Sequence, residues 1–552
     1  MRALGRGGWL AIACAVAILV VLGGGVAVAF DRGMLRPAFV STRLGTPTPN
    51  VPGGVYREAV VGTPTMLNPL LASSRVDRDL TTLLFSGLTR ADAQGAIGPD
   101  LAASWKVEED GRKYTFTLRD DVLWHDGQRF GAKDVLFTIR LLQDAAFPGD
   151  PALADFWRTV SVETPDERTV VCTLPRPYAP FLAYVGIGIL PQHALASTKA
   201  ADLPDAPFNL QPIGTGPFAF GALDSATVEV ALNRFERFYG AKPRLEGVRF
   251  RGYASTTAAI QAVAQGQVDG IGYIPPGSLA EATAIADRVN VYGASVSGYT
   301  ALFLNLKSPQ FAAREVRQAL ALAVDRDELV REGLRGWGTA GDSPILPGSW
   351  AYANQQQISD PARARQALDA VGWRLGPSGV REKGGQALAF TLLTDNEPLR
   401  VGVANVLARQ LGAIGVRVTV AAKSPEELAQ VVATRNFEAV FYGWEGLAAD
   451  PDPYQGWHSS QAETGYNFAN WVNAEADKAL EDGRLTTDPE KRKAAYATFQ
   501  RLFATEVPSL ILYYPQYHIA VSKRVTGPNA DPLNEPGDRF RTIADWQIAP
   551  ER

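Results

Sequence analysis

The stretch from Ala387 to Trp444 alternates between strand-like and helix-like segments, and this alternation restricts the fold more than any other feature of the chain. Strand-like runs occupy 387–394, 416–422 and 437–444, and helix-like runs occupy 398–415 and 424–436. Ser424 and Glu427 have the spacing of a capping box, and Pro425 suits a first helical turn. Because crossovers between strands of one sheet are right-handed, this series predicts a parallel sheet covered by helices.

A second alternation occurs earlier, with a strand at 248–253, a helix at 256–266 and a strand at 268–274. Two α/β lobes with a ligand cleft between them are therefore expected. Ligands of open parallel sheets bind beyond the carboxyl ends of the strands. In the later lobe this rule places one set of residues at the mouth of the cleft, namely Thr394, Asp395, Gly443 and Trp444.

The N-terminal region predicts attachment to, or export across, a membrane. Residues 9–30 carry no charge and follow the basic segment 1–8, which is expected in the cytoplasm. As a helix they would be about 33 Å long, enough to span a bilayer. Ala27-Val28-Ala29 also has the pattern of a signal cleavage site, so an anchor and a removed signal both stay open. The proline-containing segment 31–54 predicts a tether, with the rest of the chain on the extracytoplasmic face of the cell membrane.

Composition and motifs speak against several classes of function. The net charge of −4 and a pI near 5.8 disfavour a nucleic-acid partner, which normally requires a basic patch. The four histidines lie far from one another and from the two cysteines, so the ligand spacing of a zinc site is absent. Neither a nucleophile elbow nor a phosphate-binding glycine loop is present. We therefore expect no catalytic residues, no cofactor, no metal site and, with Cys14 and Cys172 so placed, no disulfide.

One adjacent pair still suggests chemistry, because His125 stands beside Asp126 in "YTFTLRDDVLWHDGQRF". Residues 114–118 alternate as in a half-buried strand, and Asp126-Gly127 suits a tight hairpin turn. Neighbouring side chains of an extended chain point to opposite faces, so the two are badly placed to bond each other. The sequence predicts a hairpin here and not a catalytic pair.

The same block carries a family resemblance. "LAASWKVEEDGRKYTFTLRDDVLWHDGQRFGAKDVLFTI" resembles the signature region of family 5 extracytoplasmic solute-binding proteins, the peptide/nickel class that delivers ligands to ABC transporters. Further matching blocks are "LNPLLASSRVDRDLTTLLFSGLT", "IGTGPFAF", "NRFERFYGAKPRLEGVRF", "EVRQALALAVDRDELV", "DPARARQALDAVGW" and "YNFANWVNAEADKAL". They follow the family's order over roughly 56–546.

The resemblance implies a two-lobed periplasmic-binding-protein-like α/β fold with an extra domain inserted in the first lobe and the ligand cleft between the lobes. The first lobe would comprise 55–95, 208–298 and 518–546, the inserted domain 96–207 and the second lobe 299–517. The hairpin would then belong to the inserted domain.

The resemblance also implies ligand contacts, from a loop, from a strand end and from tyrosines near the hinge. These residues are Ser73, Ser74, Arg75, Gly443, Trp444, Tyr513, Tyr514 and Tyr517. Peptide-binding members of the family carry an aspartate for the ligand's ammonium group at the position of Leu447. This departure puts free peptides in doubt, unless Asp450 or Asp452 takes over that role. Arg75 adds a positive charge that could meet a ligand carboxylate or phosphate.

The function implied is that of a monomeric, non-enzymatic receptor of an ABC importer, which captures a peptide or peptide-like solute and passes it to permease subunits. Two alternatives stay open. One is a secreted hydrolase, which would need two facing carboxylates in the cleft. The other is a membrane-tethered sensory or scaffold protein that reuses the binding fold.

Overall fold

The structure is a computed structural model that describes residues 53–355, 358–445, 447, 450–463 and 465–549. The predicted basic segment 1–8, the anchor or signal segment 9–30 and all but the end of the tether 31–54 lie outside the described residues. Among the helices of the described part, none combines the length and the apolar character needed to cross a membrane.

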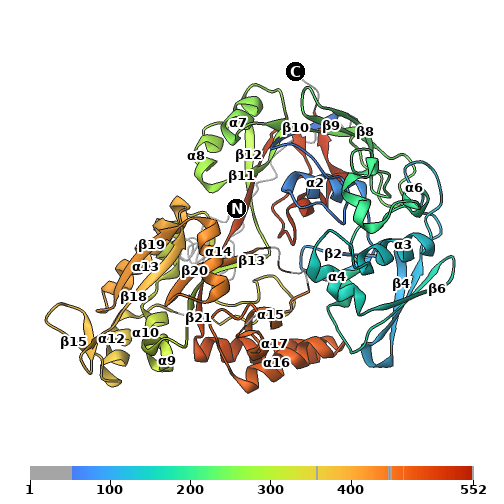
Figure 1. Ribbon diagram of the computed structural model, residues 1–552. Coiled ribbons are helices and arrows are strands. Elements are labelled where there is room, and N and C mark those ends of the chain that lie inside the picture. The colour runs from blue at the N-terminus through green and yellow to red at the C-terminus, as the bar shows by residue number, and fades with distance from the viewer. Residues whose placement is uncertain (1–52, 356–357, 446, 448–449, 464, 550–552) are drawn as a thin grey trace, which may run out of the picture. The chain divides into compact units, whose positions relative to one another are not determined.

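The larger of the two main sheets has seven strands within the described residues (Figure 1). Their order is β12 (Val289–Ser295), β22 (Gln516–Ser522), β11 (Gly270–Ile274), β1 (Val55–Val61), β10 (Gly247–Tyr253), β9 (Glu229–Arg234) and β8 (Phe218–Asp224). Helix α2 (Arg75–Leu84) packs with one set of buried side chains of this sheet, and α7 (Thr256–Ala264) packs with another. The sheet is therefore covered by helices on both faces.

The predicted strand, helix and strand at 248–274 are confirmed as β10, α7 and β11. Both strands run parallel to β1, which lies between them in the sheet. The side chain of Ser255 starts α7 by accepting a hydrogen bond from the backbone N–H of Ala258 at 3.2 Å. Ala259, Ile260 and Val263 then bury one side of the helix against the sheet.

The second main sheet has six strands within the described residues, with β18 parallel to both of its neighbours. Its order is β14 (Thr339–Ala340), β21 (Ser509–Tyr514), β13 (Gly298–Leu304), β20 (Ala439–Glu445), β18 (Ala389–Asp395) and β19 (Arg417–Lys423). Helices α13 (Pro398–Gly412) and α14 (Pro425–Thr434) connect its three parallel strands. The capping box of Ser424 and Glu427 is formed in both directions. The parallel unit predicted at 387–444 is thus confirmed.

The hairpin follows a strand of a separate four-stranded sheet. This sheet consists of β4 (Ala102–Glu108), β5 (Lys113–Leu118), β7 (Thr169–Thr173) and β6 (Ser161–Asp166). Tyr114, Phe116 and Leu118 are buried on one face, as their alternation predicts. Gly127 adopts φ 92° in the turn, and Leu123 pairs with Arg129 across it. The hairpin is confirmed, whereas the boundaries proposed for the inserted domain and the lobes stay predictions.

His125 and Asp126 each bond to a different part of the chain. His125 Nδ1 accepts a hydrogen bond from the backbone N–H of Gly214 at 3.0 Å, and Nε2 lies 3.1 Å from the carbonyl of Gly216. Burial lowers the pKa of His125 to about 4, which keeps the ring neutral. Asp126 bonds His193 at 2.9 Å. These contacts hold the hairpin in place.

The chain crosses between the two main sheets at two adjacent places. One crossing joins β12 to β13 around Val296, and the other joins β21 to β22 at Pro515. The backbone N–H of Val296 donates to the carbonyl of Pro515 at 3.5 Å. The two crossings therefore lie side by side.

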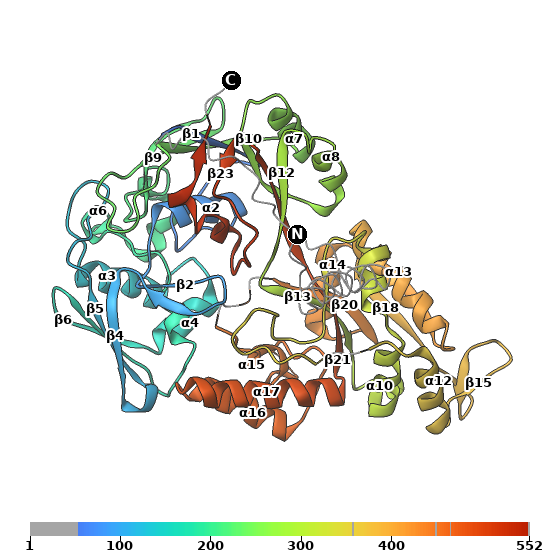
Figure 2. The same ribbon diagram turned by 180° about the vertical axis from the view of Figure 1, so that it is seen from behind.

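Three helices extend from the six-stranded sheet toward the four-stranded one (Figures 1 and 2). They are α15 (Tyr454–Trp457), α16 (Ala474–Leu485) and α17 (Pro489–Glu506). At the end of α16 the carbonyl of Arg484 accepts a hydrogen bond from the backbone N–H of Ala179 at 2.8 Å. This bond joins the region of the four-stranded sheet directly to the region of the six-stranded sheet.

Candidate ligand-binding pocket

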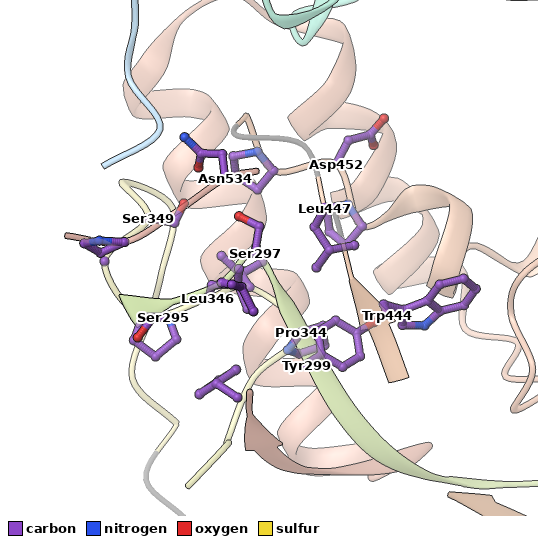
Figure 3. Close-up of a pocket in the computed structure, with 18 of the residues that line it drawn as sticks. Ser295, Ser297, Tyr299, Pro344, Leu346, Ser349, Trp444, Leu447, Asp452 and Asn534 are labelled. Carbon is purple, nitrogen blue, oxygen red and sulfur yellow. The ribbon is translucent and has the colours of Figure 1, made fainter. Parts of the chain in front are cut away.

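A pocket of about 220 Å³ lies beside the two crossings (Figure 3). Its lining comes from both sides of them. The contributing residues are 93–94, 295–297, 299, 339, 344–349, 444, 447, 451–453, 455–457, 466, 514 and 532–534. The pocket is thus built by segments that are remote from one another in sequence.

The crossing strand forms one wall through a continuous set of backbone hydrogen bonds. Ser297 N–H donates to the carbonyl of Leu533 at 2.9 Å, and Leu533 N–H donates to the carbonyl of Ser295 at 2.8 Å. On its other side, Leu447 N–H donates to the carbonyl of Ser297 at 3.1 Å. Because these bonds satisfy the backbone, the side chains of Leu533 and Leu447 are free to face the cavity.

The adjoining part of the wall is aromatic, where Trp444 of β20 pairs with Tyr299 of β13. Trp444 stacks on Phe468 with ring centroids 5.2 Å apart, and its buried indole N–H has no partner among the described residues. The indole N–H of Trp457 donates to the hydroxyl of Tyr299 at 3.1 Å, and burial raises the pKa of that tyrosine. Such rings offer a large apolar surface together with a few donors.

Asp450, one of the two acidic residues considered for an ammonium group, is already paired. Its carboxylate makes two hydrogen bonds to Arg492, at 2.8 and 2.9 Å, and the residue is 5% exposed. Burial raises the pKa of the Asp450 carboxyl, and the hydrogen bonds from Arg492 oppose that rise. Asp450 is not among the residues that line the pocket.

Asp452 does line the pocket, but its charge is also compensated. Its Oδ2 atom accepts hydrogen bonds from Arg484 at 2.7 Å and from the hydroxyl of Tyr178 at 3.0 Å. The guanidinium of Arg484 lies 4.0 Å from the ring centroid of Tyr454. The first residue before α15 is Pro453, so Asp452 links three segments and does not cap that helix.

Three predicted contact residues of the first lobe lie near α2. Ser73 is exposed, and Ser74 caps α2 by accepting a hydrogen bond from the N–H of Asp77 at 3.1 Å. The guanidinium of Arg75 lies 3.6 Å from the ring centroid of Tyr273 and 5.5 Å from that of Tyr517. Of these residues, none is among the described residues that line the pocket.

The predicted residues of the second lobe divide between the two faces of its sheet. Asp395 pairs with Arg400 at 3.3 Å, and a side chain at Gly443 would meet the same arginine. Tyr513 is buried in the core on that face. Trp444, Leu447 and Tyr514 instead line the pocket.

Several lining residues were not predicted. Ser295 and Ser297 lie in the crossing strand, Leu533 and Asn534 beside it, and 344–349 forms a loop below it. The proline-containing sequence "PILPGS" at 344–349 is a signal from which this loop could have been predicted. No group of three potential metal-ligating His, Cys, Asp or Glu side chains occurs in the described part of the chain.

Comparison with known proteins agrees with this architecture. Residues 96–466 match the model of bacterial extracellular solute-binding proteins, family 5, middle part. The chain belongs to this family. Members of family 5 are extracytoplasmic binding proteins of ABC importers, which work with permease subunits and are not enzymes.

Relatives within family 5 span nearly the whole chain. The oligopeptide-binding protein AppA of Bacillus subtilis is 28% identical over 508 residues, which cover 90% of this chain and 92% of AppA. The solved structure of AppA with a nonapeptide is similar with a TM-score of 0.67 at 27% identity, covering 90% and 99% of the two chains. NikZ from Campylobacter jejuni with Ni(L-His) gives a TM-score of 0.70 at 29% identity, covering 89% and 99%. The two-lobed family 5 fold predicted from the sequence is confirmed.

Proposed function

We propose that this protein captures a peptide or peptide-like solute in the pocket beside the crossings and delivers it to the permease of an ABC importer. One observation carries the proposal: the pocket is lined by segments from both sides of the two crossings, including Asn534 and Trp444. Closure around a ligand would bury it between these walls, so recognition can shift the population toward a closed form without bond chemistry.

Three further features complete the proposal. The protein acts as a monomer, because residues of a single chain line the pocket from both sides of the crossings. It is held at the extracytoplasmic face of the membrane by the apolar segment 9–30. It catalyses no reaction, since the acidic side chains Asp450 and Asp452 are bonded to arginines and do not face each other as free carboxylates.

Native mass spectrometry of the full-length protein in detergent, after incubation with defined solute mixtures, tests the function. One mixture contains synthetic tripeptides to hexapeptides in free and N-acetylated forms, and the others contain oligosaccharides or nickel with histidine. We expect retention of members of the peptide mixture. Retention from another mixture alone, or turnover of the peptides, would contradict the proposal.

A matched pair of variants then places the retained solute. Trp444→Phe removes part of an aromatic side chain that lines the pocket, so we expect weaker retention and a smaller change in tryptophan fluorescence. Trp105→Phe, in β4 of the four-stranded sheet, should leave both unchanged. Equal effects of the two variants would place the solute elsewhere.

A further inference from the structure

The pocket contains very few charged side chains. Among the described residues that line it, Asp452 is the one with a charged side chain. The remaining polar side chains are hydroxyls and amides, with Ser295, Ser297, Gln94 and Asn534 among them. The charge of the pocket therefore depends on how Asp452 is held.

One oxygen of the Asp452 carboxylate, Oδ2, is committed to a bridge behind the wall, and the buried Oδ1 has no hydrogen-bond partner among the described residues. Arg484 and Tyr178 both bond its Oδ2 atom, and the side chains of Asp452 and Arg484 are 11% and 12% exposed. In Figure 3 this carboxylate points away from Leu447 and Ser297. A ligand ammonium placed against Asp452 would also lie close to the guanidinium of Arg484. The two positive charges would repel each other.

The residue that faces the ligand from the same loop is Leu447. Its backbone is fixed to the crossing strand through Ser297, so the leucine side chain stays at the wall. It packs with an apolar cluster that includes Trp444 and Tyr454. An ammonium group buried here would lose its water shell and gain no carboxylate in return.

The neutral groups of the pocket suit a ligand terminus that carries no charge. The hydroxyl of Ser297 and the amide of Asn534 are among the donors of the pocket that match a carbonyl oxygen. The rings of Tyr299, Trp457 and Tyr514 add apolar surface to the same pocket. An amide or acyl group brings both a carbonyl and an apolar part.

We infer that this pocket selects an uncharged terminus, so that the solute is a peptide-like molecule whose amine is acylated, cyclised or otherwise blocked. This inference rests on the proposed function and specifies its substrate class. Leu447 and the bridge of Tyr178, Asp452 and Arg484 are the features that set the preference.

The test compares free and N-acetylated forms of the same synthetic tripeptides to hexapeptides, all without lysine, bound to the full-length protein in detergent. Native mass spectrometry identifies the retained pairs, and calorimetry gives their affinities. We expect the acetylated forms to bind at least about tenfold more tightly, because a buried unpaired ammonium is strongly unfavourable. Tighter binding of the free forms would overturn the inference while leaving the proposed function standing. Retention of neither form would overturn both.

Variants at Leu447 sharpen the test. Leu447→Asp adds a carboxylate to the neutral wall, so the preference should move toward the free amines by at least about tenfold. Leu447→Asn removes similar apolar volume without charge and should produce no such reversal. Leu375→Asp adds the same charge at a leucine that is 64% exposed and outside the pocket, and should leave the preference as it is. If Leu447→Asp does not fold, the unaltered protein and Leu447→Asn still decide between the outcomes.

Discussion

Both lobes bury charged side chains, but they place them differently with respect to the pocket. In the first lobe Arg539 bonds Glu58 on β1 and Asp79 on α2, and all three side chains are at most 2% exposed. None of the three is among the described residues that line the pocket. This cluster joins the two ends of the chain into one lobe.

In the second lobe the buried pairs lie in and behind the loop that carries Leu447. Asp450 pairs with Arg492, and Asp452 pairs with Arg484. By our proposal, similar ion pairs serve assembly in one lobe and set the charge of the pocket wall in the other. Removal of a cation should therefore have different consequences in the two lobes.

The largest effect is expected for Arg539→Met. This substitution leaves both Glu58 and Asp79 buried without their cation, and breaking a buried pair in this way costs about 3–5 kcal/mol. We expect a corresponding drop in the free energy of unfolding, measured by denaturant titration, with the preference for acetylated peptides intact in the folded fraction.

Arg501→Met is the matched control for that experiment. Arg501 pairs with Glu475 at 3.0 Å, but the side chains are 56% and 64% exposed. Exposed pairs contribute about 1 kcal/mol or less. An equal loss of stability in both variants would show that the buried pairs of Arg539 contribute no more to stability than an exposed pair does.

Arg484→Met should lower the stability of the protein less than Arg539→Met does. Unlike Arg539→Met, it should also change peptide binding. Asp452 keeps the hydrogen bond from Tyr178 and loses its cation, so we expect a loss of about 3 kcal/mol at most. The pocket wall should also become more negatively charged. Calorimetry should show that the affinity for the free peptides rises at least about tenfold relative to that for the acetylated peptides. If Arg539→Met changed this preference as strongly, the contrast between the lobes would fail.

The smallest effect is expected for Tyr178→Phe. It removes one hydrogen bond to Asp452 while Arg484 stays in place, and such a bond contributes about 1 kcal/mol. Denaturant titration should show a loss of that size, and calorimetry should show an unchanged peptide preference. A reversal of the preference would instead make the hydroxyl of Tyr178 a main determinant of the pocket's charge.

Local signals in the sequence were enough for much of the fold. The capping box of Ser424 and the alternation around Tyr114 depend on neighbours within a few residues, and both were predicted correctly. The parallel pairing of the strands was accessible as well, because right-handed crossovers restrict a strand and helix series to few arrangements.

The pocket was predicted only in part, because its charge depends on distant partners. Asp450 and Asp452 read alike in the sequence, yet their arginines come from 42 and 32 residues further along the chain. In the same way, nothing near Asp126 announces its bond to His193. Such pairs are decided by the packing of whole elements, which local patterns do not encode.

The two crossings at Val296 and Pro515 have a mechanical consequence. A single covalent link between two bodies permits bending and twisting about any axis. Two adjacent links restrict twisting and favour rotation about a single hinge axis that passes through both of them. Leu447 is hydrogen-bonded to Ser297, one residue from the crossing at Val296. Because Leu447 lies close to the hinge axis, its displacement should be small compared with that of residues far from the axis. In the proposed closure, the part of the wall formed by Ser297 and Leu447 therefore stays formed.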